Sequence, residues 1–212
     1  MWAQLVFGRL KRQDRPREVD VMKNVVSAHG DKLIEMDHVI EGRDYQRNEL
    51  VAIIKFGFRT EEQAVGLLIA SGLHQTDIAL AVQDTWCNPE QFHLDHYACL
   101  LRDTLLIDTK RAEDIYRSKV CIYRRTPSGW RVTEDNLTLL NAAKIVGIDP
   151  VLLDEGLMNA WCANAFSIGD HIWIDNAVPP RFIELLSAPD YNIHTLFPNI
   201  KSSLVAFTDL LN

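Results

Sequence analysis

The chain has 212 residues, of which 47% are hydrophobic and 24% are charged. This is the composition of an ordinary globular protein, and it excludes a disordered, collagen-like or disulfide-stapled chain. A chain of this length can bury a sizeable core. Because no internal repeat or low-complexity linker is evident, we predict a single domain over residues 1–212, with a helical front lobe at about 17–85 and a sheet-containing body at about 90–212.

The formal net charge is −7, and it is unevenly distributed. Residues 1–17 contain five basic residues and one acidic residue, whereas the rest of the chain contains 17 basic and 28 acidic residues. An acidic body disfavours broad contact with a phosphate backbone, because that affinity comes from clustered Lys and Arg. We therefore expect a protein or peptide partner rather than a nucleic acid, and the sequence does not indicate which small-molecule substrate, if any, is used.

The sequence contains no recognisable targeting signal and no cysteine-based metal-binding motif. The apolar stretch at 1–10 is interrupted by Gln4, and its basic residues follow rather than precede it, unlike a secretory signal. No run approaches the roughly 18 apolar residues that a membrane-spanning helix needs. The four cysteines form no Cys-x-x-Cys pair. We expect a soluble, cytoplasmic protein that does not associate with membranes and has no cofactor.

The first part of the chain reads as helical. Apolar residues at helical spacing predict helices over 17–29 and 75–82, and a third over 61–70 with Thr60 as its N-cap. The apolar run at 49–56 fits either a helix or a strand. These segments make up the predicted helical lobe.

β-Branched and aromatic residues become more frequent after Pro89. They predict one hairpin from strands 96–101 and 105–109, a second from strands 119–125 and 130–133, and a strand at 171–175. Further helices are predicted at 135–146, 149–163, 180–186 and 202–211. The predicted fold class is therefore α+β, with a helical N-terminal lobe followed by a small antiparallel sheet that carries packed helices.

The first predicted hairpin carries a candidate catalytic pair, with His96 at the start of one strand and Asp108 at the end of the next. This layout resembles the His and Asp half of papain-like and transglutaminase-like thiol enzymes. The resemblance implies a thiol hydrolase or acyl transferase in which His96 is the base and Asp108 orients the imidazole. The usual upstream cysteine is missing, and the circularly permuted order of some papain-like enzymes implies Cys162 as the nucleophile.

Strand register offers a test of this pair. A turn of two or four residues would place His96 and Asp108 on opposite faces of the hairpin, whereas three residues would place them on one face. Without a nucleophile the chain would be a degenerate relative of such enzymes. A non-catalytic partner-binding protein, such as an inhibitor, immunity protein or accessory factor, fits an acidic domain with no complete motif equally well.

A second cluster contains three possible metal ligands, His93, Asp95 and His96. It resembles the His-x-His-x-Asp-His signature of the metallo-β-lactamase fold, although Gln91 replaces the first histidine. The resemblance implies zinc and a metal-dependent hydrolase, because zinc-bound water is a nucleophile at neutral pH.

Overall fold

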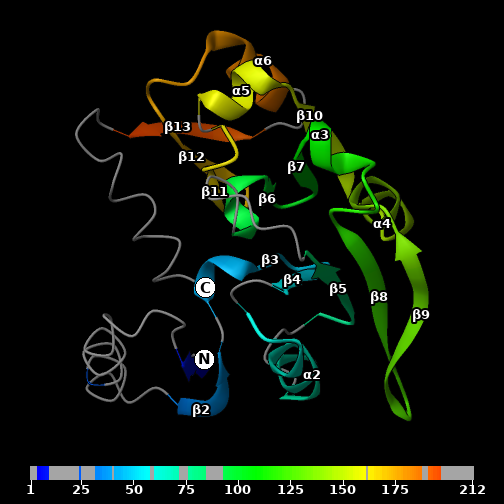
Figure 1. The fold of residues 1–212 in the computed structure, drawn as a ribbon. Helices are drawn as coiled ribbons and strands as arrows, with labels where there is room; N and C mark the ends of the chain where they lie inside the picture. Colours follow the sequence, from blue (N-terminus) through cyan, green and yellow to red (C-terminus); the bar gives the residue numbers. More distant parts are fainter. Residues whose placement is uncertain are drawn as a thin grey trace.

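The computed structural model describes residues 4–9, 24, 32–39, 41–57, 60–71, 76–84, 93–160, 162–187 and 191–196. Element labels follow Figure 1. The strands are β1 (Gln4–Arg9), β2 (Lys32–Val39), β3 (Tyr45–Arg47), β4 (Ala52–Phe56), β5 (Ile78–Gln83), β6 (Ala98–Leu100), β7 (Thr104–Asp108), β8 (Lys119–Thr126), β9 (Gly129–Leu137), β10 (Asp149–Leu153), β11 (Phe166–Ile168), β12 (His171–Asp175) and β13 (Asn192–Leu196). The helices are α2 (Glu62–Ser71), α3 (Thr109–Ala112), α4 (Leu139–Ile145), α5 (Glu155–Asn159) and α6 (Pro180–Ser187), with short 3-10 helices η1 (Gly42–Asp44) and η2 (Leu94–His96).

One arrangement of strands occurs three times within the described residues. In each case an antiparallel pair is followed by a third strand that runs parallel to the second. The three units are β3–β4–β5, β6–β7–β10 and β11–β12–β13, and the second strand is central in each unit. Parallel pairing requires a crossover connection, and each crossover here contains a helix. The repeat concerns backbone pairing rather than residue identity, which is why no internal repeat is evident in the sequence.

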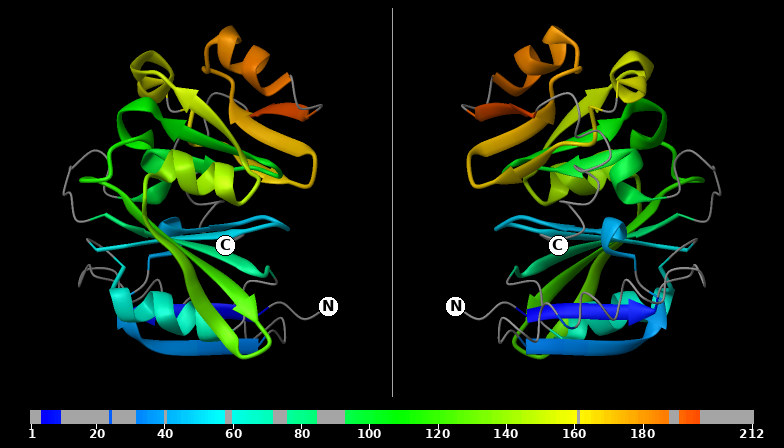
Figure 2. Two further views of the ribbon diagram at one scale, coloured as in Figure 1. Left: turned by 90° about the vertical axis from the view of Figure 1, so that its right-hand side faces the viewer. Right: turned by 90° about the vertical axis from the view of Figure 1, so that its left-hand side faces the viewer.

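The second unit contains an insertion that joins it to the first. Between β7 and β10 the chain forms α3, the β8–β9 hairpin and α4. Strand β8 pairs with β5, which extends the first unit into the five-stranded sheet β3-β4-β5-β8-β9. Figure 2 shows this hairpin, in light green, reaching from the α4 side of the molecule towards α2. One buried cluster accordingly includes Leu80 of β5, Ile107 of β7 and Ile122 of β8.

Helix α2 shows how a crossover helix lies against its unit. Val65, Leu68 and Ile69 form one apolar face of the helix, which packs on the β4–β5 pair. The small side chains of Ala79 and Ala81 on β5 belong to the same cluster, and they let the helix approach the sheet closely. In Figure 1, α2 and the other crossover helices lie towards the outside, whereas the first strands β3, β6 and β11 lie near the middle.

The predicted helical front lobe is wrong, because its described part is mostly sheet. The run at 49–56 contains β4, and the predicted helix at 75–82 is largely β5. Strand β5 is buried along most of its length between α2 and the central core, so it lacks the alternation that marks a half-exposed strand. The helix predicted over 61–70 is confirmed as α2.

The second half of the chain follows the predicted elements more closely, but the predicted small antiparallel sheet is wrong, because the sheets here combine parallel and antiparallel pairs. Both hairpins are confirmed, as are the strand at 171–175 and the helix at 180–186. The predicted helix at 149–163 is wrong at its start, since Asp149–Leu153 forms β10 alongside β7. Nearly all of 17–29 and the whole of 202–211 lie outside the described residues. No helix in the described ranges is long and apolar enough to cross a membrane.

Candidate functional site

A cavity of about 310 Å³ lies where the three repeated units meet. Each unit contributes its first strand and the segment before that strand. The cavity is lined by Arg43, Gln46, Arg47, Asp95, Cys99, Leu100, Ala163, Asn164, Ala165, Phe166, Ser167 and Ile168. The repeat therefore explains how residues more than 100 positions apart line one site.

Buried side chains connect neighbouring first strands around the cavity. Gln46 on β3 donates to the Ala98 carbonyl at 3.0 Å and accepts from the Leu100 amide at 2.7 Å, both on β6. The Cys99 thiol of β6 donates to the carbonyl of Ala165, just before β11, at 2.9 Å. These contacts satisfy backbone groups that would otherwise be unpaired in the protein interior. They engage one N–H and one lone pair of the Gln46 side-chain amide.

The charged groups of the cavity are two arginines and one aspartate. Arg43 of η1 and Asp95 of η2 form an ion pair, with 2.6 Å between Nε and Oδ2. Their side chains are only 18% and 8% exposed. Arg47 is exposed and has no acidic partner within ion-pair distance in the described ranges, so it supplies positive charge that no described carboxylate neutralises. Within the same ranges, the side chains of Asn164 and Ser167 make no hydrogen bond.

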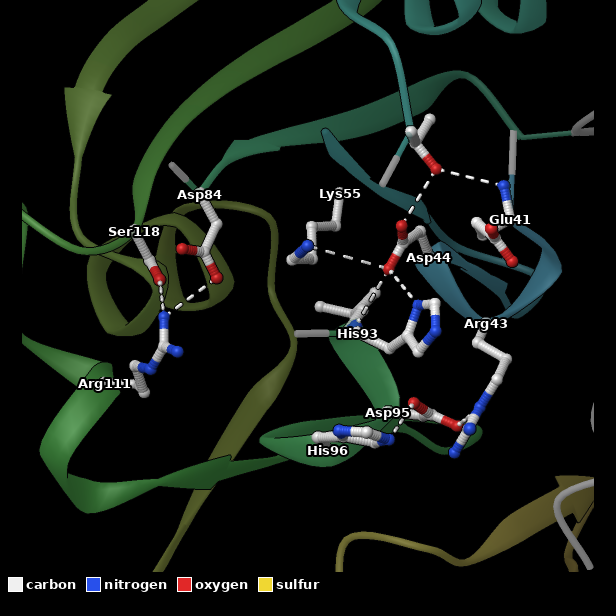
Figure 3. A network of polar contacts seen from close by, with 12 residues as sticks. Glu41, Arg43, Asp44, Lys55, Asp84, His93, Asp95, His96, Arg111 and Ser118 are labelled. Atoms are coloured by element: carbon white, nitrogen blue, oxygen red, sulfur yellow. Dashed lines mark hydrogen bonds and ion pairs between the residues drawn. The ribbon is translucent and has the colours of Figure 1, made fainter. Parts of the chain in front are cut away.

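A buried polar network lies behind the cavity and is drawn in Figure 3. The Asp44 carboxylate accepts from the Thr60 hydroxyl at 2.9 Å and the Leu94 amide at 3.1 Å. Its Oδ1 lies 3.2 Å from His93 Nδ1 and 3.8 Å from Lys55 Nζ. Lys55 and Asp44 are each 1% exposed, so their charges are compensated inside the protein. The network holds η1 against η2 and thereby places Arg43 beside Asp95.

The histidines of η2 lie next to this network. The rings of His93 and His96 meet edge to face, with 5.5 Å between their centroids. His96 Nε2 is 3.7 Å from Asp95 Oδ1, on the side of the carboxylate away from the oxygen that binds Arg43. Asp95 therefore lies between an arginine and an imidazole.

The structure does not bring His96, Asp108 and Cys162 together. Leu100 pairs with Leu105 across a two-residue turn, but His96 lies before this hairpin, in η2, so strand register does not relate it to Asp108. No hydrogen bond or ion pair joins the described side chains of His96 and Asp108. The Asp108 carboxylate accepts from the Lys110 amide and caps α3. Cys162 is buried in a different cluster, formed by the third unit and its neighbours.

The two buried cysteines of the described chain, Cys99 and Cys162, are poor nucleophiles. Burial raises the pKa of Cys99 to about 12, helped by the nearby charge of Asp95. Burial also raises the pKa of Cys162 to about 12. Both groups are thiols rather than thiolates at neutral pH, and the thiolate is the reactive form.

Cys99 and Cys162 of the folded protein are therefore expected to resist iodoacetamide at pH 7. Mass-spectrometric mapping of native and urea-unfolded samples measures this, with the half-buried Cys121 as an internal comparison. Because the folded state holds these two protons more tightly, their contribution to stability is complete below about pH 9 and is lost as the pH rises towards 12. Labelling of Cys99 or Cys162 faster than global unfolding would contradict the expectation.

His93, Asp95 and His96 do not form a metal-binding arrangement. His93 is directed to Asp44, and Asp95 is directed to the Arg43 cation. In the parts of the chain that the structure describes, no group of three or more His, Cys, Asp or Glu side chains could hold a metal ion. The zinc interpretation, together with the metal-dependent hydrolase that it implied, has no support in this geometry.

Sequence reasoning missed Asp44, Lys55, Arg43 and Arg47. A signal for Lys55 exists, because it interrupts an otherwise apolar strand, and a charge in such a position requires a buried partner. Nothing in the sequence places Arg43 beside Asp95, which is 52 residues away.

No protein-family model and no curated protein matches the sequence. Solved structures do match the fold. ArgZ, an arginine dihydrolase from Cyanobacteria, superposes with a TM-score of 0.68 and 17% identity, covering 97% of this chain and 29% of that chain. AgrE in complex with ornithine and NAD+ gives a TM-score of 0.70 and 16% identity, covering 94% of this chain and 26% of that one.

DDAH from Pseudomonas aeruginosa, as a cysteine-to-serine variant complexed with citrulline, gives a TM-score of 0.63 and 14% identity. The match covers 96% of this chain and 68% of that chain. The chain covers 67% of the N-terminal domain of ArgZ. It spans less than a third of the whole ArgZ and AgrE chains.

These matches correct the functional prediction. The papain-like or transglutaminase-like interpretation is wrong, because the structures that match this chain have a different fold. A hairpin that begins with His and ends with Asp is too short to identify a fold. The idea of an inhibitor, immunity or accessory protein has no support from these neighbours, which are enzymes or complexes with small molecules. The described chain shares its fold with the arginine dihydrolase, AgrE and DDAH structures.

Proposed function

We propose that this protein binds a small α-amino acid in the cavity between its three repeated units. The observation that carries the proposal is Arg47, the cavity guanidinium that no described carboxylate neutralises. A guanidinium matches a carboxylate with two parallel hydrogen bonds, which gives both affinity and orientation.

The remaining lining suits the rest of such a molecule. Asn164 and Ser167 offer an amide and a hydroxyl for a polar group, while Leu100, Phe166 and Ile168 provide apolar contact for an aliphatic chain. A cavity of about 310 Å³ is at the small end of ligand sites, in the range of single amino acids rather than peptides.

The structures with the same fold support this class of ligand. They include complexes with ornithine, L-arginine and citrulline, three amino acids with nitrogen-rich side chains. These three compounds are therefore the first to test.

We expect at least one of them to bind with a dissociation constant in the micromolar to millimolar range, measured by isothermal titration calorimetry. Arg47→Gln should weaken binding at least about tenfold, because the ligand carboxylate loses its charged partner. Arg131→Gln, which changes an exposed arginine of β9, is the matched control and should bind as the wild type does.

Two results would contradict the proposal. One is the absence of measurable binding of all three amino acids at 10 mM or so, far above typical ligand affinities. The other is binding that Arg47→Gln leaves unchanged.

The proposal concerns recognition rather than thiol chemistry. Cys99 lines the cavity, and its pKa of about 12 keeps it protonated at neutral pH. Cys99→Ser is therefore expected to bind the amino acid with nearly wild-type affinity. An assay for ammonia release, run on the same samples, would detect any hydrolysis of the bound side chain.

A further inference from the structure

We infer that Arg43 determines which amino acids the cavity accepts, by excluding cationic side chains and admitting uncharged ones. This inference rests on the proposed function, because it concerns the ligand of the same cavity. Its basis is the ion pair between Arg43 and Asp95, both of which line the cavity.

Asp95 is the single acidic residue among the described residues that line the cavity. A cationic ligand group would need this carboxylate, because Arg43 and Arg47 are both positively charged. Arg43 already binds Oδ2 through Nε at 2.6 Å, and the pair is mostly buried. The protein thus places a guanidinium of its own where a guanidinium ligand would bind.

Displacing Arg43 would be unfavourable for two reasons. Its side chain is only 18% exposed, so the guanidinium would lose its partner in surroundings that solvate it poorly. A ligand cation would also add a third positive charge beside Arg43 and Arg47. An uncharged ureido or amide side chain neither displaces Arg43 nor adds a positive charge, and Asn164 and Ser167 can hydrogen-bond to it.

Removing the Arg43 guanidinium should therefore reverse the preference. In Arg43→Met the apolar part of the side chain is largely kept, while the Asp95 side chain, which is 8% exposed, loses the Arg43 guanidinium. His96 Nε2, at 3.7 Å from the other carboxylate oxygen, cannot supply the geometry of a guanidinium. A ligand guanidinium would then complete the pair.

The test compares arginine with citrulline, which share a backbone and chain length and differ in a charged guanidinium against a neutral ureido group. Wild type is expected to bind citrulline more tightly. Arg43→Met should shift the ratio of the two dissociation constants towards arginine by at least about tenfold. Arg43→Gln should shift it in the same direction, which keeps the test valid if the methionine variant does not fold.

Controls isolate the carboxylate. Adding Asp95→Asn to Arg43→Met should abolish the gain for arginine, and Arg131→Met should leave the ratio unchanged. Thermal unfolding with n-butylguanidinium gives a readout that needs no amino-acid site, since this cation should raise the melting temperature of Arg43→Met but not of the double variant.

The outcomes separate the two proposals. Citrulline binding to wild type with no change of ratio in either Arg43 variant overturns the role of Arg43 and leaves the proposed function standing. Stabilisation of Arg43→Met by n-butylguanidinium, with no amino acid bound by any protein, shows that Arg43 occupies a guanidinium site at Asp95, but it rejects the proposed function and with it the selection among amino acids.

Discussion

Replacing Arg111 by methionine is expected to lower the free energy of unfolding by about 3 to 5 kcal/mol. The side chains of Arg111 and Asp84 are both 0% exposed, and Nη1 lies 2.8 Å from Oδ2 (Figure 3). The same guanidinium lies over the Tyr97 ring, with 4.5 Å between its central carbon and the ring centroid. Methionine leaves the Asp84 carboxylate buried without this cation, which is the costly outcome for an internal ion pair.

Urea unfolding of purified variants measures this effect. Arg117→Met is the matched control, because Arg117 forms a partly exposed pair with Asp114 and should change stability by less than about 1 kcal/mol. The double variant Asp84→Asn with Arg111→Met should be less destabilised than Arg111→Met alone, since it no longer buries the Asp84 charge without the Arg111 cation. A loss below about 1 kcal/mol for Arg111→Met would show that the pair is not needed for stability.

Asp44→Ala is expected to have a comparable effect, also about 3 to 5 kcal/mol, for a different reason. The buried Asp44 carboxylate accepts hydrogen bonds from the Thr60 hydroxyl and the Leu94 amide. It also contacts the His93 ring and faces the Lys55 ammonium. Alanine removes the Asp44 oxygens that these donors use, and it removes the Asp44 charge that faces Lys55, which is 1% exposed.

Asp135→Ala, on the exposed edge of β9, serves as the control and should be nearly neutral. Adding Lys55→Met to Asp44→Ala should recover part of the lost stability, because the Lys55 cation is then no longer buried without Asp44. Equal stability of wild type and Asp44→Ala would mean that the network does not hold η1 against η2. The Arg43–Asp95 pair would then need another support.

Local signals were sufficient for elements that are formed and stabilised locally. The Thr126-Pro127-Ser128-Gly129 stretch forms the turn between β8 and β9. Gly129 has φ of +107°, which residues with a side chain rarely adopt. Helix α6 follows Pro179-Pro180 as expected of a proline-initiated helix. Such elements depend on a few adjacent residues.

Local signals failed where burial decided the structure. The segments that became β5 and β10 each pair in parallel with a strand distant in sequence, at registers such as Ile54 with Ala81 and Val151 with Leu106. A strand covered on both faces shows no alternating pattern, and alanine and leucine favour a helix when taken alone. The prediction of helices there followed local propensity, which tertiary pairing overrode.

The same division applies to the site. By itself the sequence determined the hairpins, the helices α2 and α6, and the presence of a polar cluster that contains Asp95. Only the tertiary structure decided that Asp95 pairs with Arg43 rather than with a metal, and that Arg47, Asn164 and Ser167 share its cavity. The physical reason is that three units with one backbone arrangement converge through their first strands, so contacts at the centre join residues that no local pattern relates.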